Sequence, residues 1–331
     1  MSQSWLDFLK HNPLSILTSI NNPSLNYFVR RDLLNENPGN IEQLWNLPYA
    51  QKILNKQLIN GAWPDKQKAK HEGQITNYLL LETYRNLGVL VEIFGFNKFH
   101  SSIQRAAEYI FSTQTKEGDF RGIYGTQYSP NYSGGLLELL VKAGFHEDPE
   151  IKKCFQWFIS NVQIEGGWTL PLLTHGYKIY EMDPIFRNQH LLPFQPEKPF
   201  SHFITGIVIR AFAAHPLYRK NLIALRAGEL LISRFFKPDE YSARKAPKQW
   251  ESYSFPFWWH DLISVLDSLA LMGFSKDNPR IRFALNHYQS IQKLNGLWDL
   301  YILKSKSLPD LKYWIIFILC RILMRFFLLK N

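Results

Sequence analysis

Cysteine is nearly absent from this chain of 331 residues, which contains only Cys154 and Cys320. Two cysteines cannot build a disulfide framework or a cysteine-rich zinc site, so we expect a reducing, cytoplasmic environment. The first residues, MSQSWLDFLKHNPL, contain no apolar run of the length of a signal peptide, which argues against secretion. No metal ion and no cofactor is expected.

Dense blocks of basic residues are missing as well, although the formal net charge is +10. Lysine and arginine are spread along the chain among acidic residues, and no known nucleic-acid-binding motif occurs. We therefore expect no nucleic-acid partner. The positive charge still leaves open a contact with an anionic membrane surface or a phosphorylated ligand.

Aromatic residues, by contrast, are abundant at 15%, and several of them close a repeated motif. The motif consists of glutamine, three residues, glycine, one residue and an aromatic ring. It occurs as QLINGAW (57–63), QTKEGDF (114–120) and QKLNGLW (292–298). Glycine permits a sharp turn there, and the aromatic ring can pack over the end of a helix, so we expect a structural role for the motif.

Two further copies of this motif are incomplete. The copy that ends at Trp168 has Val162 in place of the glutamine, and FFKPDEY (235–241) lacks both the glutamine and the glycine. We expect these two copies to be held to their neighbouring repeats less firmly than the others.

The motif follows one helix and precedes another. A small residue stands fourteen positions before four of the closing aromatics, at Ala106, Cys154, Ala227 and Ala284. More apolar helices are expected after the motifs, at 76–87, 132–143, 202–213, 258–272 and 312–326, with a sixth candidate at 22–34. Three of them run into Gly88, Gly144 or Gly273, a typical helix stop. Alternation of amphipathic and apolar helices predicts an all-α fold, a single α/α toroid over residues 1–331. It would have five to six helical hairpins and parallel inner helices.

The motifs resemble the QW repeats of the terpenoid cyclase and protein prenyltransferase superfamily, which includes the squalene–hopene cyclases. Residues 254–300 and NNPSLNYFVRRDLL (21–34) look most like small proteins with prenyltransferase/squalene-oxidase repeats. The resemblance implies that each glutamine hydrogen-bonds the backbone of a neighbouring repeat. It also implies an isoprenoid or other apolar ligand in a central, aromatic-lined cavity.

Motifs that carry the chemistry of this superfamily are missing. The chain has no D-x-D-D acid motif, which Glu181 and Asp183 resemble only in part, and no D-D-x-x-D magnesium motif. Its cysteines cannot be placed in the zinc site of the protein prenyltransferases. We therefore keep a non-catalytic binding or scaffold protein as the alternative to an isoprenoid enzyme. A carbohydrate-active enzyme ranks last, because carboxylates on the inner helices are few.

Parallel inner helices would bring their N-termini together at one mouth of the toroid, where unpaired N–H groups favour polar ligands. Aromatic and polar residues occur at these helix starts. We expect the ligand to contact them there: His71, Tyr128, Tyr132, His202, Phe257, Trp258 and Trp259.

Asp261, in the sequence WWHD, is the expected catalytic acid, with His260 as the residue that orients it. Two indole rings could exclude water and raise the pKa of this carboxyl group, as protonation of an alkene requires. Neighbouring aromatic faces would then stabilise a carbocation. The alternative is that Asp261 only caps the helix that begins nearby.

The segment 169–200 is longer than the usual connection between helices, so we expect it to form a lid over the mouth. Asp183 is a second candidate catalytic carboxylate in it, and Glu181 a candidate ligand contact. The alternative is a solvated loop with incidental charges.

The C-terminal segment 313–329 has nearly the length of a membrane span but is interrupted by Arg321 and Arg325. We expect either the last inner helix of the toroid or a peripheral membrane contact here.

Overall fold

The computed structural model describes residues 4–71, 76–177, 190–241, 247–303, 308 and 310–328. Regular structure in this part of the chain is almost entirely helical, so the all-α prediction is confirmed. The exceptions are two short strands, β1 (Ser252–Tyr253) and β2 (Tyr301–Ile302), which pair in parallel.

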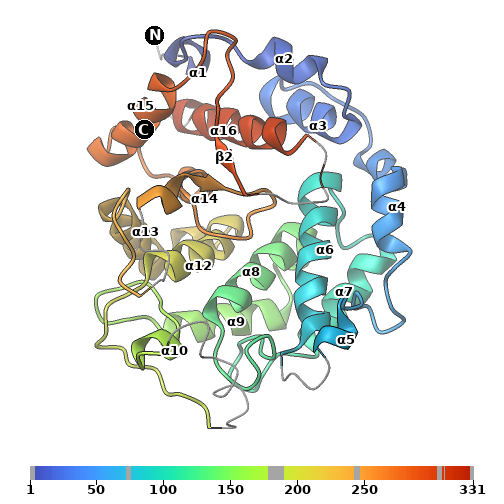
Figure 1. Cartoon of the computed structure of the whole chain (residues 1–331), viewed down its shortest axis with the longest axis vertical. Helices are drawn as coiled ribbons and strands as arrows, with labels where there is room; N and C mark the ends of the chain where they lie inside the picture. Colours follow the sequence, from blue (N-terminus) through green and yellow to red (C-terminus); the bar gives the residue numbers. More distant parts are fainter. Residues whose placement is uncertain are drawn as a thin grey trace.

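Six helical segments form the apolar interior, and each contacts the next in a closed circuit (Figure 1). In order they are α3 (Pro23–Phe28) with the π-helical turn η1 (Val29–Leu33), α6 (Tyr78–Phe94), α8 (Pro130–Leu140) with the π-helical turn η3 (Val141–Phe145), α12 (His202–Ala214), α14 (Leu262–Met272) and α16 (Leu311–Leu328). Helix α16 contacts α3 and η1, which completes the circuit. A toroid would have such a circuit; the toroid itself, with parallel inner helices, stays a prediction.

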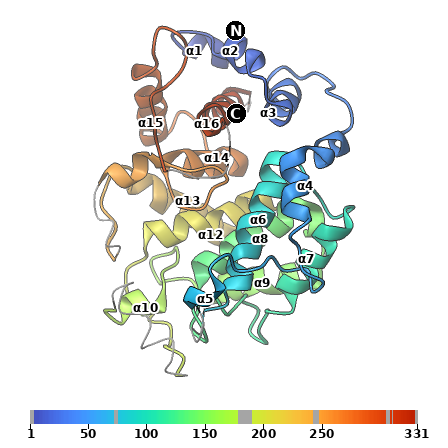
Figure 2. The ribbon, with the colours of Figure 1, turned by 45° about the vertical axis from the view of Figure 1, so that its right-hand side comes forward.

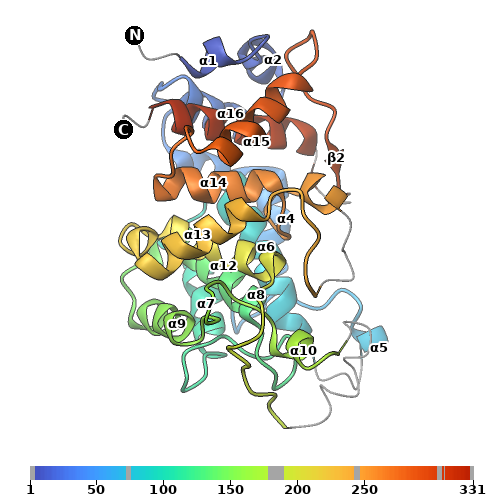
Figure 3. The same ribbon diagram turned by 90° about the vertical axis from the view of Figure 1, so that its left-hand side faces the viewer.

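Amphipathic helices pack around these six segments, the last of them against another amphipathic helix (Figure 3). They are α4 (Pro48–Leu54), α7 (Ser101–Phe111), α9 (Pro149–Ser160), α13 (Leu222–Ser233) and α15 (Pro279–Ser290). The predicted small residues Ala106, Cys154, Ala227 and Ala284 are all completely buried on them.

Shorter helical elements connect these helices. They are α1 (Trp5–Phe8), α2 (Leu14–Ser19), α5 (Lys68–His71), α10 (Pro171–Thr174) and the 3-10 turns η2 (Ile41–Asn46), η5 (Tyr218–Lys220) and η6 (Pro247–Glu251).

Two helix boundaries differ from the prediction. Helix α6 continues through Gly88 and ends at Gly95, whose φ of +63° is the left-handed conformation of a helix stop. Gly88 instead leaves room for Trp258, since a Cβ there would lie 2.9 Å from Cη2 of that indole. Helix α14 begins only at Leu262, so Trp258 belongs to the preceding loop. The stop predicted at Gly273 is confirmed, with a φ of +86°.

The closing tryptophans of the motif are anchored to the helix that precedes them. Trp63, Trp168 and Trp298 are buried, and each indole N–H donates to the carbonyl ten residues earlier. These bonds measure 2.8, 2.9 and 2.7 Å. Each indole thereby hydrogen-bonds a carbonyl near the end of a helix, where the regular amide four residues later does not bond it.

The motif glutamines link one helical hairpin to the next. Each Nε2 donates to the carbonyl of the motif glycine and to a distant backbone carbonyl. The distant acceptors are Ser102 for Gln57, Glu150 for Gln114 and His11 for Gln292, each at 2.8 Å. The last bond joins the final hairpin to the N-terminal segment, in agreement with the position of α1 and α2 next to α15 and α16 (Figure 2).

The expectation that the third motif copy is held less firmly to its neighbour is wrong, because Gln163 makes the hydrogen bonds that the missing glutamine would make. Its Nε2 donates to the carbonyls of Gln195 and Lys198 at 2.9 and 2.8 Å. The fourth copy uses a carboxylate instead: Asp239 accepts from the Ser201 hydroxyl at 2.9 Å and from the Phe203 amide at 3.0 Å.

The C-terminal helix α16 is buried among α14, α3 and η1, as expected of a last inner helix. Arg321 and Arg325 form ion pairs with Asp32 and Asp267 inside the protein. Among the helices of the described ranges, α16 included, none combines the length and the apolar character needed to cross a bilayer.

Candidate functional site

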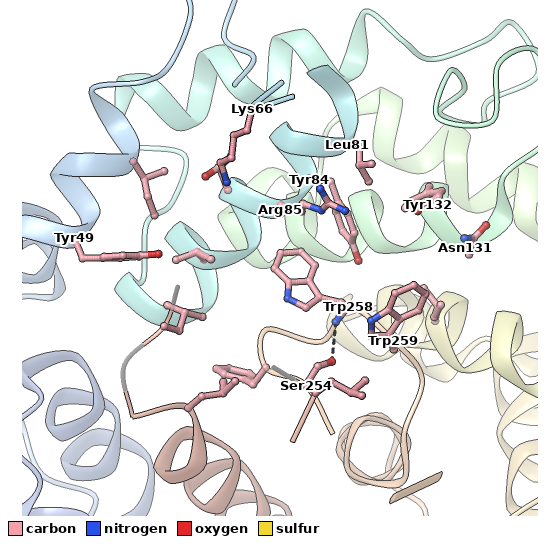
Figure 4. Close-up of a pocket in the computed structure, with 18 residues that line it drawn as sticks. Tyr49, Lys66, Leu81, Tyr84, Arg85, Asn131, Tyr132, Ser254, Trp258 and Trp259 are labelled. Carbon is pink, nitrogen blue, oxygen red and sulfur yellow. Dashed lines mark hydrogen bonds between the residues drawn. The ribbon is translucent and has the colours of Figure 1, made fainter. Parts of the chain in front are cut away.

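A cavity of about 310 Å³ opens between α4, α6, α8 and the loop that precedes α14 (Figure 4). Its volume is at the lower end of the range usual for small-molecule sites, about 300–1,000 Å³. The lining residues are Tyr49, Ile53, Lys66, Leu81, Tyr84, Arg85, Asn86, Val89, Asn131, Tyr132, Ile207, Ser254, Phe255, Trp258, Trp259, Leu303, Leu308 and Leu311.

Aromatic rings form the central wall of the cavity. Tyr84 packs edge-on against Trp258 and against Tyr132, with ring centroids 5.3 and 6.1 Å apart. Two glycines make this arrangement possible: a Cβ on Gly135 would lie 2.5 Å from the Tyr84 hydroxyl, and Gly88 accommodates Trp258. Burial raises the pKa of Tyr84 to about 12, so the phenol stays neutral.

Two cations lie at the rim of the cavity. Lys66 and Arg85 keep more than half of their side-chain surface exposed, and both pair with the buried carboxylate of Glu82, at 3.3 and 2.6 Å. Because Glu82 neutralises one of the two charges, the rim carries only a small net positive charge.

Beside the cavity, the space between the interior helices is filled by ion pairs. Glu138 of α8 accepts from Arg210 of α12 at 2.8 Å and from Lys142 at 2.7 Å. Arg210 is only 2% exposed, and its Nη1 donates to the Trp259 carbonyl at 2.9 Å. The pair Glu138–Arg210 thereby holds the loop that carries both cavity tryptophans.

This ion-pair network extends across the interior. Lys142 also pairs with Glu92 of α6. On the opposite side, Asp267 of α14 pairs with Arg325 and Arg321 of α16. Charged groups therefore occupy the space between the interior helices where these residues meet, and the aromatic-lined cavity beside them is the candidate ligand site.

Three of the predicted ligand contacts line the cavity: Tyr132, Trp258 and Trp259. Figure 4 shows both indoles and the Tyr132 ring directed toward the same space. The prediction that aromatic residues meet at one site therefore agrees with the structure for these three.

Asp261 lies behind this lining and caps α14. Its Oδ1 accepts from the Ser264 amide at 2.8 Å, and its own amide donates to the Ser264 hydroxyl at 3.0 Å. The alternative expectation of a helix cap is thus confirmed. Burial raises the pKa of Asp261 to about 7, although the Ser264 hydrogen bonds and the charge of Arg210 oppose the shift.

His260 and His202 belong to a buried cluster next to this cap. The His260 ring lies 5.3 Å from that of His202 and 4.4 Å from that of Trp250, between centroids. It packs against Gly206, where any Cβ would collide with Nδ1. Burial, followed by the charges of His202 and Arg210, lowers the pKa of His260 well below its usual value, so this ring is neutral.

The remaining predicted contacts lie elsewhere. The Tyr128 hydroxyl bonds Glu117 at 2.7 Å, away from the lining residues. Phe257 is buried, with its ring 5.9 Å from the Arg210 guanidinium. His71 ends α5, but its side chain lies outside the described residues, as do Glu181 and Asp183.

The expected lid cannot be followed over its whole length, because residues 178–189 lie outside the described ranges. The adjoining residues pack against the segment before α8: Gln127 donates to the His190 carbonyl at 2.7 Å, and the tilted rings of Phe194 and Tyr128 lie 4.5 Å apart between centroids. None of the residues described in 169–200 lines the cavity. Within the described ranges, no three His, Cys, Asp or Glu residues are grouped as a metal site would require.

Several lining residues did not appear in the sequence prediction. Tyr84 and Arg85 lie within α6 and not at a helix start, and Asn131 directly precedes the predicted Tyr132. A sequence signal for Tyr84 and Trp258 does exist, because Gly88 and Gly135 interrupt apolar helices at positions that neither begin nor end them.

No family model matches the chain. The chain is similar to part of the "Probable squalene–hopene cyclase" of Sinorhizobium fredii (strain NBRC 101917 / NGR234), with 22% identity over 184 residues. The aligned residues make up 53% of this chain and 27% of that protein. The chain therefore spans about a quarter of the relative that it matches. This distant similarity suggests a terpenoid cyclase-like fold.

Proposed function

We propose that the protein binds an isoprenoid, or a similar unsaturated apolar molecule, in the cavity between α6, α8 and the loop before α14. The observation that carries this proposal is the wall of Tyr84, Tyr132, Trp258 and Trp259, whose ring faces suit alkenes and methyl groups. The distant similarity to a squalene–hopene cyclase supports the same ligand class. The small volume favours a ligand shorter than a triterpene.

Titration of the purified protein with farnesol and squalene, delivered from cyclodextrin and followed by calorimetry, tests this proposal. We expect saturable binding of farnesol, weakened about tenfold or more in Trp258→Ala and in Trp259→Ala because each indole contributes a large apolar face. Phe99→Ala is the control, since Phe99 is 78% exposed and distant from the lining. Absence of saturable binding by every isoprenoid tested would reject the proposal.

A protonation-initiated isomerisation or cyclisation is the second candidate function. It is favoured by the pKa of Asp261, which burial raises to about 7, so that the carboxyl group holds a proton near neutral pH. Because Asp261 lies behind the cavity lining, this candidate requires the loop before α14 to shift until the carboxyl group reaches a ligand alkene. Asp261 would then give its proton to the alkene and take one back from the resulting carbocation, so no co-reactant is consumed.

Incubation with farnesyl diphosphate and squalene, followed by product analysis, separates this candidate from a non-catalytic binding protein. If Asp261 is the acid, Asp261→Asn abolishes product formation and leaves ligand affinity unchanged, because asparagine is an equally good helix cap. Saturable binding without any product in the wild-type protein would identify a binding protein instead.

A further inference from the structure

One polar side chain in the cavity is buried without being fully satisfied. Asn131 of α8 is only 9% exposed and lines the cavity next to Tyr132 and Trp259 (Figure 4). Its Nδ2 donates to the Tyr124 hydroxyl at 3.2 Å, but its Oδ1 has no hydrogen-bond partner within the described residues. A buried carbonyl oxygen in this state is unfavourable and calls for a partner.

The amide is held in place by its neighbours. Tyr124 bonds Asn131, and the Tyr124 and Tyr132 hydroxyl groups bond each other. Since the two tyrosine rings also pack edge-on, 5.2 Å apart, the three side chains form one connected polar corner. The walls around this corner, including Trp259 and Ile207, are apolar.

We propose that the ligand is an isoprenoid alcohol, whose single hydroxyl group hydrogen-bonds Asn131 while its hydrocarbon chain lies against the aromatic wall. This inference rests on the proposed isoprenoid binding and specifies its ligand class. Oδ1 has almost no accessible surface before binding, so the ligand reaches it after a small turn of the amide toward the cavity. The ligand hydroxyl then donates to Oδ1, and because it also accepts, it would pair with the amide in either orientation. A pure hydrocarbon would leave Oδ1 buried and unpaired, so the site discriminates against it.

The rim cations are a weaker anchor than Asn131 for the polar end of the ligand. Lys66 and Arg85 are more than half exposed and already pair with Glu82. A diphosphate would have to compete with that carboxylate in contact with solvent. We therefore assign the polar group to the buried amide.

Binding of four matched ligands to the full-length protein tests this assignment: farnesol, farnesyl methyl ether, the hydrocarbon farnesene and farnesyl diphosphate. For the wild type we expect farnesol to bind about tenfold more tightly than farnesene. The ether should be closer to farnesene, because it cannot donate. Asn131→Leu should abolish the preference for the alcohol without weakening farnesene binding.

Asn86→Leu is the matched control, since Asn86 also lines the cavity but its amide already donates to the Glu82 carbonyl at 2.7 Å. Its preference for farnesol should equal that of the wild type. If Asn131→Leu fails to fold, the comparison of farnesol, ether and hydrocarbon on the wild-type protein still tests the assignment. Equal affinity for these three, or tighter binding of the diphosphate than of farnesol, overturns the assignment while isoprenoid binding stands. No binding of any of the four overturns both.

Discussion

Helix α14 carries two buried aspartates in opposite electrostatic surroundings. Asp261, at its start, has no cation in hydrogen-bond contact within the described residues, and burial raises its pKa to about 7. Burial acts in the same direction on Asp267, two turns later, but the charges of Arg325, Arg321 and Lys142 outweigh it and hold the pKa below its usual value. The same residue type on one helix is thus biased toward the neutral form near the cavity and toward the charged form in the ion-pair network.

This difference extends to the two regions in which the aspartates lie. Inside its rim of Lys66 and Arg85, the cavity is lined by aromatic rings, apolar side chains and neutral polar groups. Carboxylates and cations from α6, α8, α12, α14 and α16 occupy the interior beside it. Neutral surroundings suit an apolar ligand, which gains nothing from fixed charges. The ion pairs link the neighbouring helices, and Arg210 also hydrogen-bonds the loop that carries the cavity tryptophans. We infer that the cavity is shaped by the network beside it.

Loss of the Glu138 carboxylate, which pairs with two cations in the interior, should lower the stability of the protein most. Glu138→Gln leaves Arg210, which is 2% exposed, without its ion-pair partner, so we expect the free energy of unfolding to fall by about 3–5 kcal/mol. Urea unfolding at pH 7 measures this free energy in both proteins. The control is Glu36→Gln, whose partner Arg30 is half exposed, and this change should cost less than about 1 kcal/mol. Equal losses in the two variants would show that the network does not stabilise the interior.

Asp261→Asn should change how stability depends on pH. The ordinary aspartate pKa is 3.8 and that of Asp261 is about 7, so the folded protein keeps a proton that the unfolded chain releases between these values. The contribution of Asp261 to stability therefore falls as pH rises from about 4 to 7 and is constant above. The asparagine variant has no such decline, and at pH 8 it should be more stable than the wild type by up to roughly 4 kcal/mol. Parallel unfolding curves at pH 5 and pH 8 for both proteins would contradict the raised pKa.

Asp267→Asn should show the opposite pH dependence with a smaller amplitude. A lowered pKa means that the charged form stabilises the fold above the ordinary pKa of 3.8, and that this contribution is lost as pH falls through the folded value. We expect the variant to be less stable by about 2 kcal/mol at pH 7, because Arg325 and Arg321 are partly exposed and can be solvated. Unfolding measured from pH 7 down to pH 3 should show the two proteins converging. A difference that persists unchanged at pH 3 would assign the effect to packing.

The sequence predicts helices well where residue spacing determines them. The buried small residues Ala106 and Cys154, and the stop at Gly273, follow from patterns repeated along the chain. Glutamine hydrogen bonds were expected only from the family resemblance. Gln163 shows why a strict motif misses a copy: the side chain one position later reaches carbonyls on the next segment.

The cavity was only partly predictable, because it depends on contacts between helices far apart in the sequence. Trp258 and Trp259 were expected for their aromatic rings, and they line the cavity. Asp261 is adjacent to them in sequence, yet the start of α14 directs its carboxylate to Ser264 instead. Asn131 was missed since nothing in its local sequence shows that the Oδ1 atom lacks a partner.

Gly88→Ala should have the smallest effect on stability and still alter the cavity. Alanine raises the helix propensity of α6 by about 1 kcal/mol, but its Cβ would lie 2.9 Å from Cη2 of Trp258, and such overpacking costs about 1–3 kcal/mol. The two effects largely offset each other, so the net loss should stay near 1 kcal/mol. Trp258 has to move, however, and farnesol affinity should fall several-fold.

Gly134→Ala is the matched control for this last change, because Gly134 is also a buried helical glycine. Its Cβ would lie 3.0 Å from the Cα of Val208, at the contact of α8 with α12, and would not meet the side chain of a lining residue. We expect this variant to lose more stability than Gly88→Ala, since a backbone cannot move aside as a side chain does, yet to bind farnesol like the wild type. If calorimetry instead shows unchanged farnesol affinity in Gly88→Ala, the position of Trp258 does not determine ligand binding, and the aromatic wall loses its assigned role.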